Sequence, residues 1–96
     1  MNFRIAIGTT IRETRTEKFM TLRKLSEKSS VALGHISDIE RGRKEGSSEI
    51  LECLARGLNV SMADLVILAG WKMKIANEEL SETLELDLEL ETASVS

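Results

Sequence analysis

Residues 21–42 read TLRKLSEKSSVALGHISDIERG, and this stretch holds two short helical patterns joined by a four-residue hinge. In the first pattern Leu22 and Leu25 stand three residues apart among charged residues, which gives one apolar face and one solvated face. In the second pattern apolar residues recur at i, i+4 and i+7 from Ala32 to Ile39. Two short helices joined in this way have the geometry of a helix-turn-helix, a unit that places one helix in the major groove of DNA.

The second helix has an outward face that the spacing also predicts. At about 100° per residue, five residues fall on the arc opposite the apolar stripe. They are Leu33, Gly34, Ser37, Asp38 and Arg41. Leu33 can touch a thymine methyl group and Asp38 can accept from cytosine N4, whereas Gly34 allows a close approach at a cost of up to about 1 kcal/mol of helix stability.

His35 stands on the border between the core side and the outward side of the same helix. It can donate to guanine N7, pack against the preceding helix, or meet a phosphate, and the sequence leaves these possibilities open. We predict base contacts by Leu33, Gly34, His35, Ser37 and Asp38.

Basic residues lie at both ends of the unit, where the chain should cross the DNA backbone. Phosphate contacts supply most of the affinity for duplex DNA, and the free amides at a helix start also favour phosphate. We predict phosphate contacts by Thr21, Arg23, Lys24, Arg41, Arg43 and Lys44. The alternative for any such residue is a solubilising surface charge, which is the role we favour for Lys28.

The residues around the unit follow the pattern of a known family. The pattern comprises Ile11, Arg12, Arg15, Thr21, Leu25, Ile36, Ser37, Ile39, Glu40, Arg41, Gly42, Ser47, Leu51, Ala55, Leu58, Leu65 and Gly70. Over residues 11–70 the chain therefore resembles the Cro/cI-type repressors, the XRE family. This resemblance implies an all-α fold, with a five-helix lambda-repressor-like DNA-binding bundle in residues 1–70. Residues 71–96 are left over as a C-terminal helical or acidic extension, which we expect to be a dimerisation segment and acidic tail. The resemblance also implies a structural ion pair between Arg15 and Glu40.

Three positions depart from the family pattern: Ser30 replaces a hinge glycine, Ala32 a Ser/Thr cap, and Leu22 a polar phosphate-binding residue. The missing cap at Ala32 should cost about 1 kcal/mol. These departures put the transfer of individual DNA contacts in doubt and leave the fold unaffected.

Within the family, residues 29–70 most resemble the actinobacterial regulators of Clp protease genes. This resemblance implies an activator that contacts RNA polymerase and is itself a substrate of a Clp-type protease. We expect a homodimer on a palindromic operator, because one recognition helix covers only a half-site. An antitoxin with the same fold is the alternative, and a neighbouring toxin gene would distinguish it. An enzyme is not expected, because the sequence pairs no nucleophile with a base and has no phosphate-binding glycine loop.

The overall charge hides an uneven distribution. The net charge is −3, yet residues 1–71 hold eleven Lys/Arg against nine Asp/Glu, whereas residues 72–96 hold two lysines against seven acids. A DNA-binding head with an acidic tail fits this pattern. The single Cys53 and single His35 predict no disulfide, metal site or cofactor, and Cys53 should be buried or half-buried in a helix. Without an apolar segment of membrane length or a secretory signal, we expect a cytoplasmic protein.

The chain contains no proline, and helical spacing dominates it. We expect helices over residues 2–18, from Thr21, over 32–41, from Ser47 or Ser48 to Asn59, and from Ser61 to Gly70, with Ile7, Ile11 and Phe19 turned inward.

The segment after Gly70 allows three interpretations. An extra helix from Trp71 to about Leu84 would pack on a second chain through Trp71, Ile75, Leu80 and Leu84. A paired β-ribbon over residues 84–90 would use the alternation of leucines and acids there. A solvated acidic tail is the third possibility.

Overall fold

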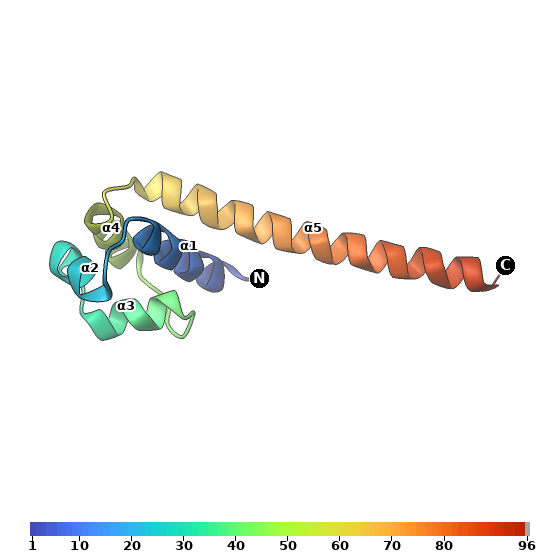
Figure 1. Cartoon of the computed structure of the whole chain (residues 1–96), viewed down its shortest axis with the longest axis horizontal. Coiled ribbons are helices and arrows are strands. Elements are labelled where there is room, and N and C mark those ends of the chain that lie inside the picture. The colour runs from blue at the N-terminus through green and yellow to red at the C-terminus, as the bar shows by residue number, and fades with distance from the viewer. Residues whose placement is uncertain (96) are drawn as a thin grey trace.

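The computed structural model describes the backbone of residues 1–95 and the side chains of residues 1–79. The described backbone forms five helices: α1 (Phe3–Glu17), α2 (Leu22–Ser29), α3 (Leu33–Glu40), α4 (Ser48–Gly57) and α5 (Met62–Val95). The first four helices and the start of α5 form a bundle, and the remainder of α5 extends beyond it (Figure 1), so the molecule measures 63 × 24 × 22 Å. The predicted all-α, five-helix architecture is confirmed.

One apolar core joins all five helices. Its buried residues are Ala6, Ile7, Ile11, Leu25, Val31, Ile36, Ile39, Leu51, Leu54, Ala55, Leu58, Leu65 and Ala69. Each fully buried Ile or Leu contributes about 2 kcal/mol of burial free energy. Of the positions that helical spacing placed on the inner face, Ile7, Ile11, Ile36 and Ile39 are at most 2% exposed. Ala32 is an exception, because it precedes α3 and is exposed.

Hydroxyl side chains cap three helices where the sequence predicted a helix start. The amides of Lys24, Ile50 and Asp64 donate to Thr21 Oγ1 at 3.0 Å, Ser47 Oγ at 3.2 Å and Ser61 Oγ at 2.9 Å. Helix α3 begins after Ala32 without a side-chain cap, as the alanine at that position dictates.

Phe19 is not inside, and the prediction for it is wrong. Its side chain is 96% exposed, and its backbone lies in the left-handed region at φ 55°. The amides of Phe19 and Met20 donate to the carbonyls of Thr16 and Arg15, which is the Schellman arrangement that closes a helix. The chain reverses at Phe19, so the ring points outward and Met20 packs on the core instead.

Gly70 does not end the fifth helix, which is a second correction. Among the described glycines Gly42 alone has a positive φ, and α5 continues through Gly70 to Val95. A glycine stops a helix when the following chain turns away, and the residues after Gly70 are mostly strong helix formers. The β-ribbon over residues 84–90 is wrong for the same reason, because that backbone is helical (Figure 1). The division of the chain at residue 70 stays a prediction.

No single helix among the described residues is long and apolar enough to span a membrane. Only α4 and Met62–Glu79, bent by 105° relative to each other, meet that criterion as a pair, by length and composition alone.

Candidate nucleic-acid interface

Helix α3 lies at the edge of the bundle opposite α5, where it packs on α1 and α2 (Figure 1). Its inner side chains, Ile36 and Ile39, are fully buried. On the other side Leu33 is 41% exposed, Gly34 and Arg41 are exposed, and Ser37 and Asp38 are half-buried. The structure therefore brings the predicted base-reading residues together on one accessible face.

Gly34 leaves that face unusually open. Apart from the two neighbouring residues and the nearby backbone of α3, a Cβ atom added at Gly34 would meet no atom of the described residues within 4 Å. Packing within the described part of the chain therefore does not require a glycine at this position. The absence of a side chain leaves the helix backbone accessible to an external surface that approaches closely.

Arg15 and Glu40 lie together and join α1 to the end of α3. Arg15 Nε and Nη2 donate to Glu40 Oε2 at 2.7 Å and Oε1 at 3.0 Å, and Arg15 Nη1 donates to the Met20 carbonyl at 2.8 Å. The side chains are only 12% and 5% exposed. The hydrogen bonds to Glu40 raise the pKa of Arg15 above its ordinary value, with the carboxylate charge acting in the same direction and burial opposing both. The pair fixes α3 on the bundle.

Gly8 provides a second support for α3, which the sequence interpretation did not include. A Cβ atom at Gly8 would lie 2.1 Å from the Ile39 carbonyl oxygen and 3.0 Å from that of Glu40. Only a glycine in α1 allows the end of α3 to lie so close. The signal in the sequence was a glycine within the apolar stripe of an otherwise regular helix.

The basic residues after α3 follow a tight helix end. Gly42 has φ 71°, and the amides of Arg43 and Lys44 point back to the Asp38 carbonyl at 2.8 and 3.4 Å. Arg41, Arg43 and Lys44 are exposed. Lys44 Nζ lies 3.5 Å from Asp38 Oδ2. The side chain predicted to contact a phosphate therefore forms an ion pair with a side chain predicted to contact a base.

The start of α2 presents the second group of predicted phosphate contacts. Arg23 and Lys24 are exposed, and the Thr21 hydroxyl accepts from the Lys24 amide while its own hydrogen stays available to donate. Leu22, half-buried, packs on the core instead of offering a polar contact.

His35 lies at the border of the face, as its position on the helix predicted. The residue is half-buried, and its Nε2 atom is fully buried with no hydrogen-bond partner. Among residues 1–79 no other side-chain nitrogen or oxygen is both buried and unpaired.

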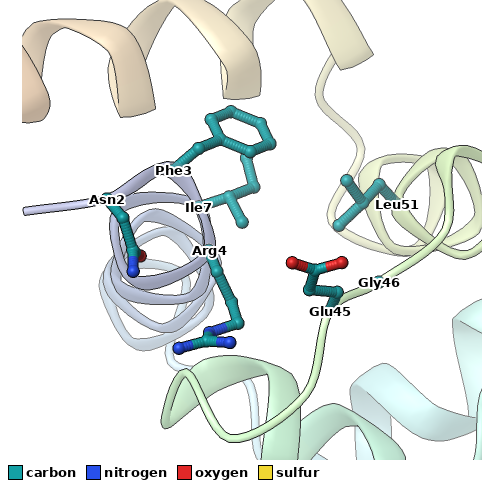
Figure 2. Close-up of a pocket in the computed structure, with 7 residues that line it drawn as sticks. All are labelled: Asn2, Phe3, Arg4, Ile7, Glu45, Gly46 and Leu51. Carbon is teal, nitrogen blue, oxygen red and sulfur yellow. The ribbon is translucent and has the colours of Figure 1, made fainter.

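A hollow of about 430 Å³ lies between the start of α1 and the link from α3 to α4. Figure 2 shows Phe3, Arg4 and Ile7 on the α1 side and Glu45 and Gly46 on the link opposite. Arg4 is exposed and extends toward the link that carries Arg43 and Lys44. Its positive charge beside the basic link is a feature that the sequence interpretation missed. In residues 1–79 no group of His, Cys, Asp or Glu is arranged to hold a metal ion.

The exposed side of α5 carries the predicted dimerisation residues Trp71 and Ile75, which are 54% and 51% exposed. Ile67 and Leu68 continue this apolar stripe at 55% and 49% exposure, and Lys74 Nζ lies 5.2 Å from the Trp71 ring centroid. The side chains of Leu80 and Leu84 lie outside the described residues.

The bundle with an accessible α3 defines a helix-turn-helix DNA-binding domain, and the family model for Helix-turn-helix matches residues 11–65. The chain belongs to this family, in its XRE type.

Within the family the chain is similar to the transcriptional regulator ClgR of Mycobacterium tuberculosis, with 40% identity over 70 residues, which cover 73% of this chain and 62% of that protein. The chain thus matches less than two thirds of that relative's length. The crystal structure of the clp gene regulator ClgR from Corynebacterium glutamicum is 40% identical, with a TM-score of 0.77 over 91% of this chain and 95% of that one.

A more distant neighbour is the restriction-modification controller protein C.Esp1396I, solved as a tetramer with its natural 35 base-pair operator. It is 29% identical, with a TM-score of 0.65 over 72% of this chain and 95% of that one.

Proposed function

We propose that this protein is a cytoplasmic, sequence-specific transcription regulator that reads DNA with α3. The observation that carries the proposal is the accessible face of α3, on which Leu33, Gly34, Ser37 and Asp38 lie together above a helix fixed by the Arg15–Glu40 pair. A rigidly held helix with one apolar side chain, one glycine and two polar side chains on its outward face fits the major groove, where base edges carry the sequence information.

Basic residues and one threonine around this face are placed to contact the DNA backbone. Arg41, Arg43 and Lys44 at one end of α3, with Thr21, Arg23 and Lys24 at the start of α2, contact phosphates on either side of the groove. Arg4 adds to the positive potential beside the link. Lys44 releases Asp38 when it moves to a phosphate, which frees the carboxylate to accept from a base.

The exposed stripe on α5 supports a homodimer on a palindromic operator. Ile67, Leu68, Trp71 and Ile75 form a run of large apolar side chains, each about half exposed, along one side of a helix. Burying this stripe against its own copy removes it from water and gives a two-fold assembly that reads two half-sites about one helical turn apart. Leu80 and Leu84 extend the same segment in the sequence.

The likeness to ClgR supports a narrower role as an activator of Clp protease genes. In that role the DNA-bound dimer contacts RNA polymerase, and the protein is itself degraded by a Clp-type protease.

Binding to promoter fragments tests the proposal. The full chain should bind a fragment from upstream of a clp gene of its own genome more tightly than a shuffled fragment of the same composition. Asp38→Ala should remove part of that preference, about 1 to 3 kcal/mol at one base position, while Lys28→Ala leaves it unchanged. Equal affinity for the two fragments would reject regulation of Clp genes, and equal affinity for all sequences would reject specific readout.

Sedimentation tests the dimer. Glutamate at both Trp71 and Ile75 should leave a folded monomer, because both side chains are exposed in the single chain. A dimer that survives both substitutions would place the contact elsewhere.

A further inference from the structure

The two nitrogens of His35 lie in different surroundings. Nε2 has no accessible surface and no partner, whereas Nδ1 is not among the buried unpaired atoms and takes part in no hydrogen bond within residues 1–79. Nδ1 is therefore the nitrogen that reaches solvent on the α3 side of the molecule.

This asymmetry selects one form of the ring. A proton on Nε2 would be a buried N–H group without an acceptor, and such orphaned donors are the rarest unsatisfied groups in proteins. A proton on Nδ1 meets water or an external acceptor instead. The tautomer of a histidine follows the hydrogen bonds open to its two nitrogens, so the accessible one carries the proton here.

The Nδ1 donor of His35 has a short reach. Only Cβ and Cγ separate Nδ1 from the backbone, so this donor extends no further than the amide of an asparagine. A base edge can meet it only if the helix backbone comes close to the DNA. The preceding residue is Gly34, and apart from its two chain neighbours and the nearby backbone of α3, no atom of the described residues lies within 4 Å of the position of its missing Cβ.

We propose that His35 presents Nδ1–H as a single donor to a guanine acceptor, N7 or O6, in the major groove, and that Gly34 makes this short reach possible. The proposal rests on the proposed function, because it assumes that α3 enters the groove. Of the three alternatives for His35, which are base contact, phosphate contact and packing, the proposal selects base contact. His35 is then one of the residues that determine the sequence specificity of DNA binding.

The tautomer can be measured without DNA. Long-range proton–nitrogen correlation spectra of the full chain at neutral pH should place the ring proton of His35, the sole histidine, on Nδ1. A proton on Nε2, or protons on both nitrogens, would overturn the proposal and leave the proposed function intact.

Two variants of His35 separate the nitrogens in a binding experiment. The nitrogen of an asparagine side chain takes the place of Nδ1 and that of a glutamine the place of Nε2, so His35→Asn should keep the affinity and His35→Gln should lose about tenfold. The probe is the tightest duplex selected from a random library, and thermal melting of each variant confirms that it is folded. Equal losses in two folded variants would overturn the proposal.

Base analogues identify the acceptor. In each half-site 7-deazaguanine removes N7 and 2-aminopurine removes O6, and one of the two should weaken the wild type about tenfold at a single guanine while leaving His35→Gln unaffected. Gly34→Ala should lose the same increment, and adding it to His35→Gln should cost nothing more. If no guanine analogue distinguishes the wild type from His35→Gln, the donor meets a phosphate and the proposal is wrong. A wild type with no preferred sequence would refute the proposed function as well.

Discussion

Removing either partner of the Arg15–Glu40 pair should destabilise the fold strongly and unequally. Arg15→Ala strands a carboxylate that is only 5% exposed and also leaves the Met20 carbonyl without its donor. Glu40→Ala strands a guanidinium that is 12% exposed and still bonded to Met20. Breaking a buried pair costs about 3 to 5 kcal/mol, so we expect about 4 kcal/mol for Arg15→Ala and about 3 kcal/mol for Glu40→Ala.

The double variant should cost clearly less than the sum of the two single losses, because it strands no charge. Urea unfolding followed by far-UV circular dichroism measures all three at one protein concentration. Arg12→Ala is the matched control: the same residue type, exposed on the same helix, should change the free energy of unfolding by no more than about 0.5 kcal/mol. Single losses below about 1 kcal/mol, or losses that add, would refute the reasoning. Because the pKa of Arg15 is raised, its contribution is present below its unfolded pKa and fades only as the pH rises through the folded value.

Four further predictions test the remaining features. Gly8→Ala should destabilise the fold by about 1 to 3 kcal/mol or more, because its Cβ would meet the Ile39 backbone oxygen. Gly34→Ala should instead stabilise the fold by up to about 1 kcal/mol and weaken specific DNA binding. Thermal melts measure the stability of both variants, and anisotropy titrations measure their DNA binding. Phe19→Gly should raise the free energy of unfolding by about 1 kcal/mol by relieving the left-handed backbone, and Phe19→Ala, which keeps that strain, should not; equal effects in urea unfolding would locate the cost in the exposed ring instead. Arg43→Ala should lower the slope of log affinity against log salt by up to about one unit on specific and random duplexes alike, while Lys28→Ala leaves it unchanged; an unaltered slope for Arg43→Ala removes that residue from the phosphate contacts. Lys44→Ala should lower the slope less, because in the free protein Lys44 already pairs with Asp38, and a larger drop than for Arg43→Ala would show that this pair has no influence.

Most of the fold could be predicted from the sequence, because its apolar spacing is regular and three of its helix starts carry hydroxyl caps. Ile36 and Ile39 oriented α3 correctly, and Thr21 marked the start of α2. The prediction that Phe19 is buried was wrong because it rested on hydrophobicity alone. The reversal of the chain after α1 decides where the ring points. The prediction that the fifth helix ends at Gly70 was wrong because a glycine within a helix and a glycine after a helix look alike in a sequence.

The residues on the accessible face of α3 could be predicted from the sequence, but the contacts between the side chains of the candidate site could not. The spacing on α3 identified the outward residues without showing that Lys44 reaches Asp38, since that contact depends on the turn at Gly42. The close approach at Gly8 likewise arises from packing between helices that are distant along the chain, and the burial of His35 Nε2 is visible only in the folded molecule. Of these features only the Gly8 contact has a local signal in the sequence, the glycine within the apolar stripe of α1.

A hydroxyl-radical footprint of the full chain on a promoter fragment from upstream of a clp gene tests the central claim most directly. We expect protection of two symmetric half-sites on one side of the duplex, centred about one helical turn apart, and the protection of both should weaken equally when Arg43 is replaced by alanine. Uniform weak protection along the fragment, the same as on shuffled DNA, would contradict it.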